Sequence, residues 1–193
     1  MKKDRLAVLG LGNILRGDDG IGVRLVKELT SELSPSPLVE LIDAGVGGLR
    51  LLNWFDDASA VLAVDSAQMN LTPGSHQWII PSQLASKQDI AFTLHDLDFA
   101  QTLWYAEKFF SRPPTVIFAI QPQTIDQSER LSQPLNDALP HLLNHLRQAL
   151  ENWTSQCQQF QKALTGEAAM DQKDKLLLAC LSQRTESKCT NTN

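Results

Sequence analysis

Three acidic positions are the side chains of this sequence best placed to do chemistry. Asp18-Asp19, Asp43 and Asp65 follow three successive apolar runs that are typical of strands. In an open parallel sheet the carboxyl ends of the strands share one edge, so carboxylates from separate loops would converge there. Asp18 and Asp43 could equally well cap a turn or a helix. Asp65 ends a buried strand and has no obvious capping role, which favours a functional one.

A histidine could add a nitrogen ligand to these carboxylates. Of the four histidines, His95 stands within Thr93-Leu-His-Asp-Leu97, at the expected start of a helix. One imidazole and two carboxylates form a ligand set that suits nickel, zinc or iron, although a lone histidine here could also form only a local hydrogen bond. His141 and His145 have the i, i+4 spacing of a helical metal pair. No third ligand lies near them in the sequence, so we interpret this pair as a solvated helix face.

The glycine-rich loop after the first apolar run invites a nucleotide-binding interpretation. Gly10-Leu-Gly-Asn-Ile-Leu15 has two glycines of the G-x-G-x-x-G motif. Leu15 replaces the third glycine, whose role is to let a helix pack closely on a strand. Asp18 and Asp19 in the same loop would repel a phosphate. The dinucleotide signal is therefore weak, and the G-x-S-x-G, D-[ST]-G and H-E-x-x-H protease motifs are absent.

The elements that must position these residues alternate between apolar runs and segments of helical periodicity. Such alternation with short links predicts an α/β fold with a mostly parallel sheet of about five strands, covered by helices on both faces. The expected strands are residues 6–11, 38–42, 60–64, 76–80 and 115–120, and the expected helices are residues 21–33, 49–55, 94–110 and 131–153.

The composition changes after residue 153. Residues 154–193 are rich in glutamine, lysine, serine and threonine, and they contain no strand-like run. Residues 176–181 could form a short helix. We therefore expect one domain over residues 1–153, followed by a polar appendage over residues 154–193 that is partly helical or disordered.

Charge and composition exclude several classes of protein. The net charge is −5, and the 17 lysines and arginines form no dense block, which argues against a nucleic-acid surface. No apolar run approaches the roughly 20 residues that span a bilayer. Charged residues interrupt the first apolar stretch, which argues against export. The three cysteines form neither a disulfide framework nor a zinc motif. We expect a cytoplasmic protein.

Five segments in this order and spacing resemble the hydrogenase maturation proteases, the endopeptidases of [NiFe]-hydrogenase large subunits. The resemblance covers residues 6–150. One of the segments contains His95. Just before the segment Ile120-Gln-Pro122 this chain has Ala119 at a position where glycine is common in the family. The segments are Gly10-Leu-Gly-Asn-Ile-Leu-Arg-Gly-Asp-Asp-Gly-Ile-Gly22, Leu41-Ile-Asp-Ala-Gly-Val-Gly-Gly48, Val61-Leu-Ala-Val-Asp65, Leu94-His-Asp-Leu97 and Ile120-Gln-Pro122.

The resemblance implies a three-layer α/β/α sandwich around a twisted sheet and a metal ion held by Asp19, Asp65 and His95. The implied ion is nickel, which belongs to the substrate and is sensed by the enzyme, although another divalent metal ion could substitute in vitro. Asp43, with Gly45 beside it, would orient the substrate or support the site. The implied catalysis is of the aspartic or the metal-dependent type, in which Asp19 or Asp65 could activate water.

The resemblance thus implies an endopeptidase that removes the C-terminal extension of a [NiFe]-hydrogenase large-subunit precursor after nickel insertion. We expect it to act as a monomer, with no nucleic acid and no membrane span. Two alternatives stay open at this point. One is a non-enzymatic nickel-binding chaperone or scaffold for hydrogenase assembly, and the other is a nucleotide-binding α/β module.

Overall fold

The computed structural model describes residues 4–86, 91–92, 94–109, 111–164 and 168–183. Within these ranges the side chains of residues 49, 85–86, 91–98 and 100 are not described. The described residues form one mixed, mostly parallel sheet with the strand order β2-β1-β3-β6-β4, and β5 pairs with β3. The strands are β1 (Leu6–Leu11), β2 (Val39–Gly45), β3 (Ala60–Gln68), β4 (His76–Ile79), β5 (Ala91–Phe92) and β6 (Thr115–Ile120).

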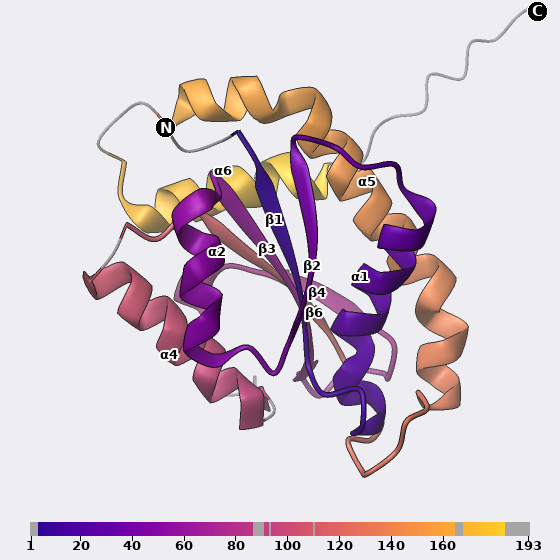
Figure 1. Cartoon of the computed structure of the whole chain (residues 1–193). Helices are drawn as coiled ribbons and strands as arrows, with labels where there is room; N and C mark the ends of the chain where they lie inside the picture. The colour runs from indigo at the N-terminus through magenta and orange to yellow at the C-terminus, as the bar shows by residue number, and fades with distance from the viewer. Residues whose placement is uncertain (1–3, 87–90, 93, 110, 165–167, 184–193) are drawn as a thin grey trace, which may run out of the picture.

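Helices cover both faces of this sheet, which confirms the predicted α/β sandwich (Figure 1). On one face α1 (Ile21–Glu32), α5 (Gln133–Ala163) and α6 (Met170–Ser182) pack on the sheet in one apolar core. On the other face α2 (Leu52–Asp57) and α4 (Leu94–Phe109) enclose a second core. The shorter helices are η1 (Gly17–Gly20), η2 (Gly48–Leu51) and α3 (Pro81–Ser86).

Two glycines, Gly22 of α1 and Gly12 after β1, allow helix and strand backbones to pack directly against each other. A Cβ on Gly22 would lie 2.0 Å from the carbonyl oxygen of Val64 and 2.5 Å from that of Leu11. Gly22 therefore provides the close helix-on-strand packing that Leu15 cannot. Gly12 has a φ of +113°, and a Cβ there would lie 1.8 Å from the Asp19 carbonyl oxygen. Only glycine allows η1 to fold back over the end of β1 in this way.

Two strands are longer than predicted, which changes the place of two aspartates. β2 continues to Gly45 and β3 continues to Gln68. Asp43 pairs with Gly10 of β1, and Asp65 pairs with Ala119 of β6. Both aspartates therefore lie inside strands rather than after them, because neighbouring strands supply backbone partners beyond the apolar run.

The long helix α5 does not end at Trp153 but continues for ten residues, to Ala163. The boundary expected from composition therefore falls inside α5. Trp153, Cys157 and Phe160 are buried at i, i+4 and i+7, so the apolar stripe continues through the glutamine-rich sequence. Leu177 and Leu181 of α6 are buried in the same core as α1 and α5.

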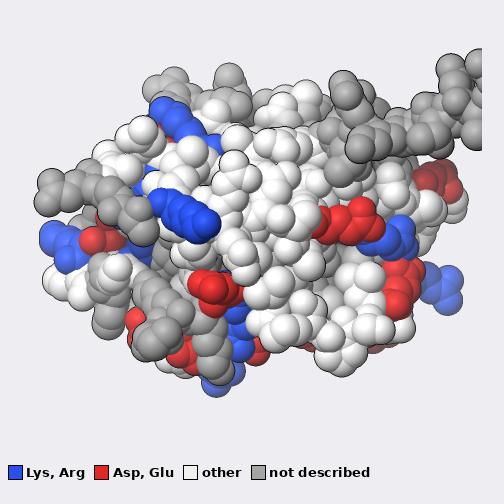
Figure 2. Space-filling view, turned by 90° about the horizontal axis from the view of Figure 1, so that it is seen from above, with Lys and Arg blue, Asp and Glu red and all other residues white. Residues whose placement is uncertain are grey.

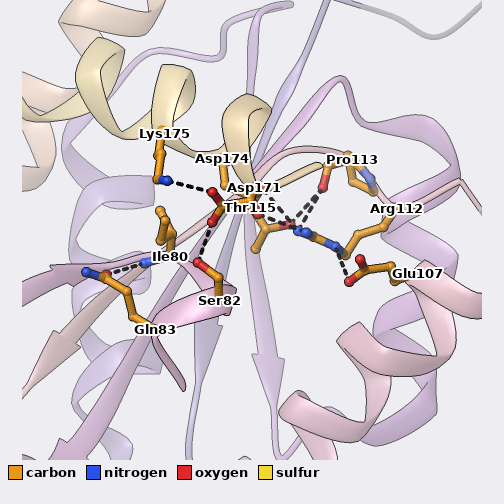
Figure 3. Close-up of polar contacts among 10 residues, drawn as sticks. All are labelled: Ile80, Ser82, Gln83, Glu107, Arg112, Pro113, Thr115, Asp171, Asp174 and Lys175. Atoms are coloured by element: carbon orange, nitrogen blue, oxygen red, sulfur yellow. Dashed lines mark hydrogen bonds and ion pairs between the residues drawn. The ribbon is translucent and has the colours of Figure 1, made fainter. Parts of the chain in front are cut away.

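A buried ion pair fastens α6 to the rest of the molecule (Figure 3). The Arg112 guanidinium donates to the two carboxylate oxygens of Asp174 at 3.1 and 2.8 Å. The backbone amide of Thr115, the first residue of β6, also donates to Asp174, at 2.8 Å. Nearby, Asp171 of α6 accepts a hydrogen bond from Ser82 of α3 and forms an ion pair with Lys175.

The basic side chains are dispersed over the surface seen in Figure 2, as the sequence predicts from the lack of a dense basic block. On the face shown in Figure 2, charged side chains of both signs are scattered among uncharged residues, and lysine and arginine form no continuous basic patch. Among the described residues, no helix combines the length and the apolar character that a membrane span would need.

Candidate active site at the carboxyl edge of the sheet

Asp19 and Asp65, which the sequence pattern predicts to converge, both contact one serine. The Ser66 hydroxyl donates to Asp19 Oδ1 at 3.4 Å, and the Ser66 backbone amide donates to Asp65 Oδ1 at 2.8 Å. The other carboxylate oxygen of Asp19 accepts the backbone amide of Asn13 at 2.9 Å. Asp19 and Asp65 are almost completely buried, at 0% and 2% exposure. The structure thus links the buried Asp19 of η1 to β3 through Ser66, the residue that follows the buried Asp65.

Strand alternation directs these side chains to different faces of β3. Asp65 shares its face with Ala63 and Ala67, which pack in the core beneath α2 and α4. Ser66 faces the opposite way, toward η1, and reaches Asp19 there. Asp65 therefore lies on the face covered by α4, whose second residue is His95. The His95 side chain lies outside the described part of the structure.

Asp18, by contrast, has a structural environment. Its Oδ2 accepts the backbone amides of Gln123 at 2.9 Å and Thr124 at 3.1 Å, and the hydroxyl of Ser132 at 2.8 Å. Its Oδ1 accepts the Ser132 amide at 2.7 Å. This buried carboxylate fastens η1 to the segment between β6 and α5. Of the two readings that the sequence leaves open for Asp18, the structure supports the turn-stabilising one.

Asp43 and Gly45 lie on the neighbouring edge strand, β2. The Asp43 side chain is 44% exposed and forms an ion pair of 3.0 Å with Lys27 of α1. The Gly45 carbonyl accepts the backbone amide of Gly12 at 2.9 Å, and an added Cβ at Gly45 would have no atom within 4 Å. Both residues therefore stand at the open margin of the sheet edge, while Asp19 and Asp65 are buried.

Gln121 is a further polar residue at this edge, which lies in the Ile120-Gln-Pro122 segment but was not predicted as a site residue. Its side-chain oxygen accepts the backbone amides of Met69 at 2.7 Å and Leu71 at 3.2 Å. Its amide nitrogen donates to the side chain of Gln68 at 2.9 Å. Gln121 thus holds the loop that follows Asp65 on β3. The signal for it was a polar residue directly after a buried strand, within Ile120-Gln-Pro122.

The loops at this edge also expose apolar side chains. Four aliphatic residues, each more than a third exposed, lie in the segments that follow β1, β2 and β3. Because these strands are parallel, the three segments lie at the same edge. Exposed apolar groups beside buried polar ones are typical of binding surfaces for peptides. The four residues are Ile14, Leu15, Val46 and Leu71.

The histidine pair on α5 has a third member that the sequence could not reveal. His76 at the start of β4 lies beside His141 and His145, and their ligand atoms are all within 4.8 Å of one another. His141 is exposed, in agreement with a solvated helix face, but His76 adds a third imidazole from a strand that is distant in the sequence.

Comparisons with known proteins identify the family of this chain. A family model described as hydrogenase maturation protease matches residues 23–149. The hydrogenase expression/formation protein HupD of Bradyrhizobium diazoefficiens is 28% identical over 157 residues, which cover 78% of this chain and 80% of HupD. The hydrogenase maturating endopeptidase HybD of E. coli has a TM-score of 0.67 at 25% identity, covering 76% of this chain and 92% of HybD.

A second solved structure, the hydrogenase 2 maturation peptidase of a Thaumarchaeota archaeon, has a TM-score of 0.56 at 28% identity. The match covers 76% of this chain and 97% of that one. The family model spans more than half of the chain, and the fold and the order of its elements are shared with solved members. This chain belongs to the hydrogenase maturation protease family.

Proposed function

We propose that this chain is an endopeptidase that removes the C-terminal extension of a [NiFe]-hydrogenase large-subunit precursor after nickel insertion. The observation that carries the proposal is the contact of Ser66 with both Asp19 and Asp65. Asp19 of η1 and Asp65 of β3 are both almost completely buried, in a chain of the maturation protease family, and this supports the proposal. The exposed aliphatic side chains around that edge suit an extended peptide.

The role we propose for Asp19, Asp65 and His95 is to contact nickel that the precursor already holds. Together they offer two carboxylate oxygens and one imidazole nitrogen but no thiolate. Cysteine thiolates in the precursor would be the softer and stronger hosts for nickel. The protease would then bind metal-loaded precursor more tightly than empty precursor, because specificity is a difference between two affinities. Cleavage would therefore depend on correct metal insertion.

Hydrolysis at this edge would use the same carboxylates. Asp19 or Asp65 would accept a proton from a water molecule as its oxygen attacks the carbonyl carbon of the scissile bond. The bond to nitrogen then breaks, and the leaving amine takes up a proton. Asp43 and Gly45, at the open margin of β2, would position the peptide that runs along the edge. A buried setting strengthens such electrostatic interactions.

The test is to offer the purified, metal-free chain two forms of the same precursor, one nickel-loaded and one without metal. Precursor length is followed by mass spectrometry. We expect only the loaded form to be shortened. Equal cleavage of both forms would contradict nickel sensing, and cleavage of the metal-free form only after nickel is preloaded on the enzyme would indicate a conventional metalloprotease. Tight nickel binding without any shortening would favour the non-enzymatic chaperone.

A further inference from the structure

Three histidines form a cluster on the α5 side of the sheet, apart from the carboxylate pair. His76 is the first residue of β4, while His141 and His145 stand one turn apart on α5. The Nε2 atoms of His141 and His145 are 3.1 Å apart. The ring of His76 lies 4.4 Å from that of His145 and 5.9 Å from that of His141, measured between centroids.

The fold holds these rings in place from two elements. His141 and His145 share one face of α5 because residues four apart on a helix are neighbours. β4 runs antiparallel to β6, and His76 is paired with Ile120. The His76 ring also packs against the Phe118 ring of β6, with 4.6 Å between centroids, so it is held on the face that α5 covers.

The geometry matches what a tetrahedral metal site requires. Two imidazole nitrogens that each bind one zinc ion at 2.0–2.1 Å lie about 3.3 Å from each other in a tetrahedron. The observed separation of 3.1 Å between His141 and His145 is close to that value. The third nitrogen already lies within 4.8 Å of the other two, and the exposed His141 has room to adjust.

The protonation state of His76 also suits a ligand. Burial, together with repulsion from the neighbouring His145 and His141, lowers the pKa of His76 to about 4. The imidazole is therefore neutral at neutral pH, which is the form that binds a metal ion.

We propose that His76, His141 and His145 bind one divalent transition-metal ion of the zinc class, with a fourth position left for water. The ion would join the edge strand β4 to α5. A cavity of about 230 Å³ beside His76 and His145, lined also by Trp78, Gln148 and the end of α6, gives water access to that position.

This site is separate from the proposed peptidase site. Ile120 pairs with His76 on one side and with Ser66 on the other. Two strand spacings, about 10 Å, therefore separate His76 from Ser66 along the sheet. The proposal does not rest on the proteolytic function, because the three histidines would bind the ion whether or not a precursor is cleaved.

The experiment is a zinc titration of the untagged, full-length chain after treatment with a chelator, followed by calorimetry. We expect His141→Gln to lose one equivalent of zinc or to bind it at least about 100-fold more weakly, since even changes around the ligands of a metal cost 10–100-fold. Asn144→Gln, on the exposed face of the same helix, is the matched control and should bind zinc like the wild type.

The Tm provides a second measurement of zinc binding, and a His76 variant tests whether His76 is the third ligand. Zinc should raise the Tm of the wild type and of Asn144→Gln but not that of His141→Gln, because only the folded chain forms the site. His76→Gln should weaken zinc binding as His141→Gln does, and unchanged affinity in a folded His76 variant would reduce the site to an ordinary helical pair. A wild type that binds no zinc, or a His141→Gln variant with unchanged stoichiometry and affinity, would overturn the proposal. Neither result bears on precursor cleavage.

Discussion

Asp18 accepts hydrogen bonds from both the backbone amide and the hydroxyl of Ser132, at 2.7 and 2.8 Å, and so ties η1 to the start of α5. The next residue, Asp19, is the one that reaches Ser66 on β3. Two adjacent aspartates thus have different tasks. One fixes the loop to a distant segment, and the other projects its carboxylate toward the sheet edge.

Asp18→Asn should destabilise the chain by about 1–3 kcal/mol, the cost of leaving buried donors unsatisfied. An amide group has only one acceptor oxygen, whereas both carboxylate oxygens of Asp18 accept hydrogen bonds. The free energy of unfolding from urea denaturation measures this loss. Asp137→Asn, on the exposed face of α5, is the matched control and should change it little. Equal stability of both variants would mean that the Asp18 contacts are not needed.

Asp174→Asn should destabilise the chain by about 3 kcal/mol or more, because Arg112 loses its buried counter-charge and keeps only the exposed Glu107 carboxylate, 3.8 Å from its Nε. The side chains of Arg112 and Asp174 are only 2% and 1% exposed. Thermal and urea unfolding both report the loss.

Ending the chain after Trp153 should lower the free energy of unfolding still more, since it also removes Phe160, Leu177 and Leu181 from the core.

The control for this ion pair lies one turn earlier on the same helix. Asp171 pairs with Lys175 on the surface, where ion pairs add little to stability. Asp171→Asn should therefore leave unfolding nearly unchanged. If Asp171→Asn and Asp174→Asn had the same effect, burial of the Arg112 pair would not be what fastens α6. A folded, stable truncation after Trp153 would restore the view of residues 154–193 as an appendage.

The sequence predicts the bounds of an element correctly where a local pattern of residues determines them. The strands at residues 6–11 and 115–120 were predicted with their observed bounds, because each is a continuous apolar run with clear ends. Parallel strand order also predicts that Asp19 and Asp65 meet at one sheet edge, and the structure places Asp19 against Ser66, the residue next to Asp65. The extension of α5 was missed because glutamine-rich composition hid the spacing of Trp153, Cys157 and Phe160.

Other features depend on contacts between distant segments and could not be read from the chain. Asp18 and Asp19 have the same chemistry, and only the contacts of Asp18 with Ser132, Gln123 and Thr124 show that it stabilises the loop. His76 joins His141 and His145 because β4 pairs antiparallel with β6 at the far edge of the sheet. Gln121 holds the loop after β3 through side-chain contacts that no spacing rule predicts.

Cys180 should resist alkylation in the folded chain. Burial, together with the neighbouring Cys157, raises the pKa of its thiol to about 11. The reactive species is the thiolate, so at pH 8 the thiol is almost wholly protonated and also shielded. Iodoacetamide labelling followed by peptide mass spectrometry should modify Cys180 slowly in buffer and rapidly in urea. Labelling at the same rate in both conditions would show that α6 does not stay packed on α5.

Asp19→Asn and Asp65→Asn should each reduce precursor processing by at least about 100-fold, the lower range of what a general base contributes. Asn has nearly the same size and shape as Asp, so the variants should fold although both side chains are buried, as circular dichroism would show. His95→Ala should behave in the same way if it contacts the nickel of the precursor. Processing is measured as the rate at which nickel-loaded precursor is shortened.

Ser66→Ala gives the sharper test of the carboxylate pair. The substitution removes the hydroxyl that donates to Asp19 but keeps the backbone amide that donates to Asp65. We expect a partial loss of processing, smaller than in Asp19→Asn, because Asp19 loses one of its hydrogen-bond donors while both carboxylates stay. Asp126→Asn, on an exposed loop, is the control and should process precursor at the wild-type rate. Wild-type processing rates in Asp19→Asn or Asp65→Asn would remove that residue from the catalytic site. A Ser66→Ala variant as active as the wild type would show that the hydrogen bond from Ser66 does not position Asp19.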